Sequence, residues 1–152
     1  DDGNEWREIE FKWKAGALEK RPQFVQPHQP RLDWQMWFAA LFYERVAEYF
    51  KKTYNQDPIS QEEHFLLMRQ VPISKRYRWF YLFLNQIFKN EKEVLSLLKN
   101  GKTGPAPKYL RVWLYDYHFT SITERSESGN WWKRDNQRLI LPKFSKEEIW
   151  IP

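Results

Sequence analysis

The sequence predicts an α+β domain in which an antiparallel sheet packs against several helices. Three observations lead to this fold class. A period-two pattern over residues 8–14 predicts a strand, helical periodicity dominates residues 33–99, and a second strand pattern follows over residues 109–120. Strands that flank a block of helices, rather than alternating with them, favour an antiparallel sheet. A length of 152 residues fits one domain, so we treat residues 1–152 as a single unit.

The first strand is indicated by Ile9, Phe11 and Trp13, which alternate with charged residues. Asp2-Gly3, just before it, is a dipeptide typical of hairpin turns. A turn at this place implies a partner strand further upstream. We therefore expect the domain to be truncated at its N-terminal edge.

A long helix is expected from Asp33 to about Lys52, after an extended lead in which prolines recur. Asp33 is expected to cap its first turn, and Leu32 to pack on Trp37 as a hydrophobic staple. Because the first half of this helix is apolar nearly all round, we expect it in the interior, with Trp37 in the core.

Turn signals divide the rest of the helical region into three further helices. The first begins at Ser60 and ends before Pro72, the second runs over residues 74–89, and the third, capped by Asn90, continues through residue 99 to the stop at Gly101. The second is expected to bury the following residues: Tyr77, Phe80, Tyr81, Leu84 and Phe88.

The strongest strand pattern covers Tyr109–Thr120, with apolar residues on both faces, which predicts a central place in the sheet. Residues 126–130 are expected to form a turn and residues 131–134 the returning strand. Residues 139–142 are expected to follow as an irregular segment.

Composition limits the possible functions. The net charge is +5, the pI is near 9.3 and the mean hydropathy is −0.84, but acidic and basic residues alternate, as on a solvated mixed surface. We therefore expect no nucleic-acid partner. No uninterrupted apolar stretch approaches the ~20 residues of a membrane span. The absence of cysteine excludes disulfides and thiolate metal sites.

No catalytic, metal or cofactor site is expected. The histidines His28, His64 and His118 have no ligand spacing, and the glycines form no phosphate-binding loop. Asp116 and His118 could orient a nucleophile such as Ser121 or Ser126, but no nucleophile elbow surrounds any serine. A hydrogen-bonded pair at the strand end is the favoured interpretation, so the chain is not expected to be an enzyme.

Two groups of residues are candidates for contact with a partner. Arg31 and Asp33 lie at the start of the long helix, where a helix cap and a structural arginine are the ordinary interpretation. Trp131 and Trp132 are neighbours on a strand, so one of them must leave the layer that the other enters. Lys133 and Arg134 follow them, and a basic aromatic edge of this kind can stack on a base, a sugar or a protein side chain.

The run from Arg21 to Leu41 resembles the signature of the lipase maturation factor family, in its soluble C-terminal domain. Three other segments resemble it in the same order along the chain: residues 5–14, 107–120 and 129–134. Residues from about 43 to 77 match poorly.

The resemblance implies a role in protein assembly. Lipase maturation factors are multi-pass membrane proteins of the endoplasmic reticulum, and their lumenal C-terminal domain helps secreted dimeric lipases to mature. We therefore expect a non-catalytic domain that contacts client proteins, on the lumenal side of a membrane-anchored parent. The alternative is a binding module for glycans or lipid headgroups, because the turn at residues 2–6 resembles one in discoidin-like β-sandwiches. A weaker alternative is binding of single-stranded nucleic acid at the basic aromatic edge.

Overall fold

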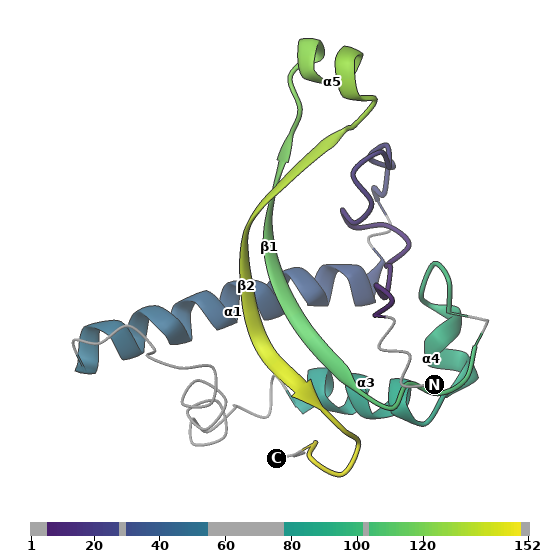
Figure 1. The fold of residues 1–152 in the computed structure, drawn as a ribbon, viewed down its shortest axis with the longest axis vertical. Helices are drawn as coiled ribbons and strands as arrows, with labels where there is room; N and C mark the ends of the chain where they lie inside the picture. Colours follow the sequence, from purple (N-terminus) through teal and green to yellow (C-terminus); the bar gives the residue numbers. More distant parts are fainter. Residues whose placement is uncertain (1–5, 28–29, 55–77, 102–103, 150–152) are drawn as a thin grey trace.

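The computed structural model describes residues 6–27, 30–54, 78–101 and 104–149. These residues form four helices and a two-stranded antiparallel sheet, so the predicted α+β class is confirmed. In chain order the elements are α1 (Arg31–Tyr54), α3 (Arg78–Phe88), α4 (Lys92–Ser96), β1 (Leu110–Phe119), α5 (Ile122–Ser128) and β2 (Trp132–Phe144). The strands form a long twisted ribbon with α5 at one end and α3 near the other, while α1 runs across it (Figure 1).

The hydrophobic core lies at the end of the ribbon that is away from α5. The amphipathic pattern of α3 places four apolar residues on one face, and all four are buried: Phe83, Leu84, Ile87 and Phe88. The core is completed by Leu98, Leu110, Leu141 and Phe144. The rings of Phe88 and Phe144 meet edge to face with centroids 5.7 Å apart, so the last residue of β2 is fixed against α3.

The predicted strand at residues 109–120 is confirmed, and the strand that pairs with it is longer than the expected residues 131–134. Phe119 pairs with Trp132 and Leu110 with Phe144, so β2 is a continuous strand as far as residue 144. The irregular segment expected at residues 139–142 is wrong, since these residues belong to β2 and Leu141 is only 2% exposed. The central position expected for β1 is also wrong, because within the described residues it pairs with β2 alone.

The first predicted strand is reduced to one bridge between Phe11 and Leu98. Other interactions occupy the backbone groups that a ladder needs. The Lys20 ammonium donates to the carbonyls of Phe11 and Lys14, at 3.1 and 3.2 Å, and the amides of Trp13 and Lys14 donate to a side chain of α1. The turn expected at Asp2-Gly3 lies outside the described residues.

The long helix is confirmed, but its first half is not in the interior. Leu32 and Met36 pack against the core on one side of α1. Trp34, Trp37 and Phe38 point the other way and are 44%, 52% and 43% exposed. The core position expected for Trp37 is therefore wrong, whereas its packing on Leu32 stays a prediction. Within the described residues, the core therefore covers one side of this half of α1 and leaves the opposite side exposed.

Three predicted helix and turn boundaries need correction. Asn90 does not cap α4. It ends α3 in the left-handed conformation, at φ 55°, with the Asn90 and Glu91 amides donating to the carbonyls of Ile87 and Gln86, at 3.0 Å each. The helix expected through residue 99 ends at Ser96. The turn expected at residues 126–130 is the end of α5, which Gly129 closes at φ 74°.

Gly101, the expected helix stop, lies against the preceding helix, because a Cβ atom there would stand 1.7 Å from the Leu95 carbonyl oxygen. The helix expected from Ser60 to before Pro72, and the residues 74–77 expected at the start of α3, lie outside the described residues.

Candidate functional site

Asp33 lies in the first turn of α1, and its side chain binds a segment that lies about twenty residues earlier in the chain. The helix begins after Pro30, whose carbonyl accepts from the Trp34 amide at 3.0 Å. The Asp33 Oδ1 atom accepts from the Trp13 amide at 2.9 Å and from the Lys14 amide at 2.8 Å. Its side chain is 7% exposed. The helix cap expected for Asp33 is therefore wrong, because its carboxylate is used to hold residues 13–14 against the start of α1.

Two lysines organise the segment that Asp33 holds. The Lys20 ammonium donates to three carbonyls of that segment, those of Phe11, Lys12 and Lys14. Burial lowers the pKa of Lys14 below its usual value, although Asp33 and Glu8 act in the opposite direction. Burial also lowers the pKa of Lys20. These contacts give residues 11–20 a compact turn without a strand.

The two tryptophans at the start of β2 are both half-buried, and both bind this same segment. The Trp131 and Trp132 amides donate to the Leu18 carbonyl at 2.9 and 3.1 Å. The Trp132 indole Nε1 atom donates to the Lys20 carbonyl at 2.7 Å, and its ring stacks on Phe119 with centroids 4.5 Å apart. Trp132 is therefore fixed on both its polar and its apolar side.

Trp131 is held by cations. The guanidinium carbon of Arg125 lies 4.2 Å from its ring centroid, and that of Arg21 lies 5.4 Å from it. These distances are within the range of cation–π attraction. Of the two tryptophans that sequence alone could not separate, Trp131 is the one with guanidinium groups around its ring.

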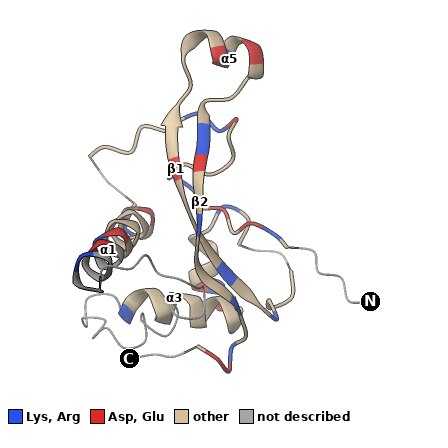
Figure 2. Cartoon of the chain, turned by 60° about the vertical axis from the view of Figure 1, so that its left-hand side comes forward, with Lys and Arg blue, Asp and Glu red and all other residues tan. Residues whose placement is uncertain are grey.

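The basic pair that follows is engaged in ion pairs. Lys133 pairs with Glu124 of α5. Arg134 pairs with Glu8 at 3.3 Å, donates to the Tyr117 hydroxyl at 3.4 Å and stacks over Tyr115 at 4.4 Å. Basic and acidic residues lie side by side along the ribbon, as the alternating sequence predicts (Figure 2).

The segment of residues 13–20 joins the two groups of candidate residues. Asp33 binds it at residues 13–14, and Trp131 and Trp132 bind it at residues 18 and 20. The Tyr117 hydroxyl adds a bond to the Gly16 carbonyl at 3.2 Å. Arg31 is exposed and makes no side-chain hydrogen bond or ion pair with the described residues, so it stays apart from the others.

Sequence reasoning missed two exposed apolar residues beside the tryptophans. Phe119 is 65% exposed and Ile122, the first residue of α5, is 80% exposed. The signal for α5 is readable as Ser121 and Glu124. These two residues form a capping box, in which the Ser121 hydroxyl accepts from the Glu124 amide and Glu124 accepts from the Ser121 amide. We call Phe119, Ile122, Trp131 and Trp132 the hairpin tip.

The acid–base pair considered at the end of β1 does not form. Asp116 accepts from Arg138 at 2.7 Å and from Asn136 at 2.8 Å, whereas His118 faces Asp135 at 3.5 Å. The described residues contain no group of three or more His, Asp or Glu side chains that could hold a metal ion. His28 and His64 lie outside them.

A family model of the lipase maturation factor C-terminal domain matches residues 1–78 and 65–142, which together cover most of the chain. This chain belongs to the lipase maturation factor family. The family match extends through residues 43–77, and its two ranges overlap at residues 65–78. The poor resemblance of that region therefore does not interrupt the family domain.

Among relatives, the chain is 32% identical over 151 residues to lipase maturation factor 2 of Gallus gallus. This alignment covers 95% of the chain and 17% of that protein. It is 30% identical to human lipase maturation factor 2 over 149 residues, and 28% identical to human lipase maturation factor 1 over 147 residues. The human alignments cover 95% of the chain but only 16% and 21% of those proteins. No solved structure matches the chain.

The described helices of this family member include none that is long and apolar enough to cross a bilayer.

Proposed function

We propose that this domain works by contact alone, as a non-catalytic folding and assembly module that binds client proteins at the hairpin tip. The relatives carry the name lipase maturation factor, which favours lipases as clients. Membership of this family favours secreted lipases and the lumen of the endoplasmic reticulum as the compartment. The observation that carries the proposal is the exposure of Phe119 and Ile122 at the end of the ribbon far from the core (Figure 1).

The shape of the tip suits such contacts. The stacked rings of Phe119 and Trp132 offer a flat apolar surface. Arg21 and Arg125, both of which stack on Trp131, supply guanidinium donors at its rim, and Lys133 adds an ammonium group that pairs with Glu124 of α5. Aromatic and arginine side chains carry much of the binding energy in protein interfaces.

Asp33 supports this surface indirectly. It holds residues 13–14, and the same segment continues to the carbonyls of Leu18 and Lys20 that position Trp131 and Trp132. We therefore assign Asp33 a positioning role and place the contact itself at the tip and at the basic residues Lys133 and Arg134. Arg31 lies outside this surface.

The described residues do not support the alternative of a discoidin-like module for glycans or lipid headgroups. It expected a β-sandwich, and the described part of the chain has one sheet of two strands.

The test is co-purification of secreted lipases with a membrane-anchored parent protein that contains this domain. Replacing Phe119 and Ile122 by alanine should lower lipase capture about tenfold, because two exposed apolar anchors are lost together. The matched control is Leu97→Ala, which removes an exposed leucine far from the tip and should leave capture unchanged. Unchanged capture in the double variant and in Trp131→Ala, with the fold intact, would rule out the tip as the contact surface.

A further inference from the structure

The outward side of α1 carries a second exposed surface, which the proposed function does not use. Residues seven positions apart lie nearly in line on a helix, since two turns contain about 7.2 residues. Arg31, Phe38, Arg45 and Lys52 form one such line, and Trp34 and Trp37 lie beside it. We call these six residues the outer stripe of α1.

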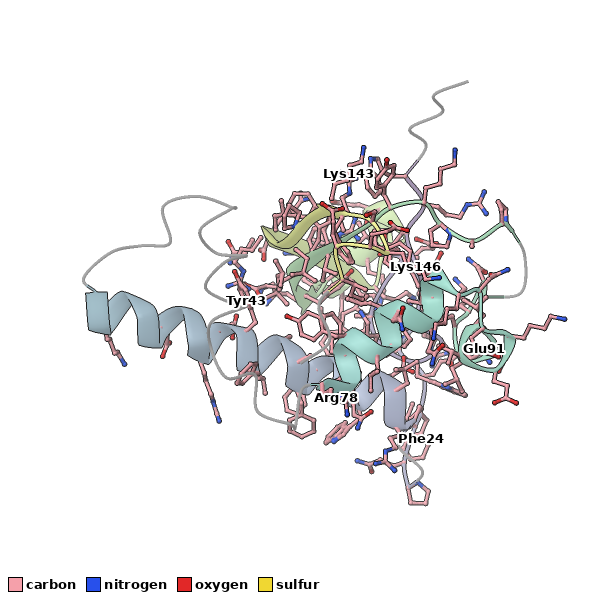
Figure 3. The ribbon with its side chains drawn as sticks, turned by 90° about the horizontal axis from the view of Figure 1, so that it is seen from below. Phe24, Tyr43, Arg78, Glu91, Lys143 and Lys146 are labelled. Carbon is pink, nitrogen blue, oxygen red and sulfur yellow. The ribbon has the colours of Figure 1, made fainter. Side chains whose placement is uncertain are left out.

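The aromatic part of the outer stripe packs on itself. Ring centroids are 5.3 Å apart between Trp34 and Trp37, 5.6 Å between Trp34 and Phe38, and 5.3 Å between Trp37 and Phe38. All three rings are exposed. Phe24, just before the helix, is exposed as well and lies at the outer edge of the molecule, near the start of α1 (Figure 3). Adjacent exposed rings of this kind mark an interaction surface.

The charged part of the outer stripe is mostly positive. Arg31, Arg45 and Lys52 are exposed along the length of the helix. Glu48 is the acidic residue among them, and its contact with Lys52 is 4.0 Å long between two well-exposed side chains. Such a contact neutralises little of the positive charge in water. The stripe therefore combines an aromatic centre with cations before and after it.

We propose that the outer stripe of α1 docks on the surface of an anionic lipid bilayer. Indole rings favour the boundary between headgroups and acyl chains, because they join an apolar body to a polar N–H. Trp34, Trp37 and Phe38 enter this boundary, while Arg31, Arg45 and Lys52 pair with lipid phosphates on either side. The α1 helix then lies in the plane of the surface, as amphipathic interfacial helices do.

The spacing of the cations favours a bilayer over a protein partner. From Arg31 to Lys52 the stripe runs about 30 Å along a helix. A flat surface of uniform negative charge satisfies cations at both ends of such a length. A protein interface concentrates its energy in a central cluster and has few charges at its core. A second copy of the chain would bring the same positive residues together.

The test is co-sedimentation of the 152-residue chain with vesicles of phosphatidylcholine, alone or mixed with phosphatidylserine. The chain should bind the mixed vesicles more tightly, and less tightly as salt is raised. Replacing Trp34 and Trp37 together by alanine should weaken this binding at least about tenfold, since the apolar area that enters the membrane is lost. Arg45→Glu should weaken it about fivefold or more, and on the mixed vesicles only.

The matched control is Leu97→Ala, which removes an apolar residue of similar exposure, 50%, that belongs neither to the outer stripe nor to the hairpin tip, and it should bind vesicles like the unchanged chain. Circular dichroism checks the fold of each variant, and Arg45→Glu carries the test if the double variant does not fold. Equal binding of unchanged chain and variants would overturn the proposal. So would self-association in sedimentation without vesicle binding, which would assign the stripe to a second copy.

Discussion

At the scale of single residues, Asp33 links two distant parts of the chain, the start of α1 and residues 13–14. One carboxylate oxygen satisfies two backbone amides that lie about twenty residues earlier in the chain. Because Asp33 is in the first turn of α1, the positive end of the helix also stabilises its charge. Its removal would leave two partly buried amide donors without this partner.

We expect Asp33→Ala to lower the free energy of unfolding by about 1 to 3 kcal/mol, because two partly buried donors lose their partner. Urea denaturation measures it. Asp33→Asn keeps an acceptor oxygen at the same place and should lose clearly less. Equal stability of Asp33→Ala and the unchanged chain would show that residues 13–14 do not need the carboxylate.

Sequence could single out Asp33 but could not assign its partner. An acidic residue before an apolar helix predicts a cap, because caps depend on spacing along the chain. Its bonds to Trp13 and Lys14 depend on where the N-terminal segment returns in space, and no local pattern carries that information. The same holds for Trp131 and Trp132, whose partners Leu18 and Lys20 lie more than a hundred residues away.

At the scale of elements, α5 shows what local rules decide. A capping box at its start and a glycine at its end fix this short helix between the strands. The Lys133 ammonium and the Ser121 amide both bind the Glu124 carboxylate and hold its pKa at about 2.

The titration of Glu124 follows from these contacts. Its pKa is depressed in the folded chain, so its contribution to stability is present above the unfolded value of 4.5 and is lost as the pH falls from there toward 2. NMR titration of the Glu124 carboxyl carbon should show the low pKa. Lys133→Ala should raise it toward 4.5, whereas Arg134→Ala, one residue along, should leave it in place. An unchanged pKa in Lys133→Ala would contradict the ion pair.

Elements with strong periodicity were predicted well, and those shaped by distant contacts were not. The helix α1 and the strand β1 follow their patterns closely. The end of β2 was missed because consecutive apolar residues and Pro142 hide the alternation of a strand. The strand expected at residues 8–14 has the right alternation but lacks free backbone groups, since Asp33 and Lys20 occupy them.

At the scale of the whole molecule, apolar residues are divided between one core and two exposed surfaces. The core joins α3 to the far end of the ribbon. The hairpin tip and the outer stripe of α1 lie outside it. Sequence could not make this division, because aromatic residues have the same periodicity whether they face a core or a partner.

Alanine substitutions of a core residue and of an exposed residue measure this difference in burial. Phe88→Ala should lower the free energy of unfolding by about 3 to 5 kcal/mol, because it leaves a cavity in the core. Trp37→Ala removes a larger ring but should cost about 1 kcal/mol or less, since half of that ring already faces water. Thermal or urea unfolding of the two variants side by side decides it. If Trp37→Ala lost as much stability as Phe88→Ala, the conclusion that Trp37 is exposed would be wrong.

The bonds from Leu18 and Lys20 to Trp131 and Trp132 have a consequence for biosynthesis. A ribosome releases the residues of the N-terminal segment long before it makes the strand that binds them. Until then their carbonyl groups remain hydrated, or are bound by whatever chaperone is at hand. Asp33 can hold residues 13–14 early, but the carbonyls of Leu18 and Lys20 gain their donors only after the last strand has been translated, and a pause or stop before residue 131 would leave them without these partners.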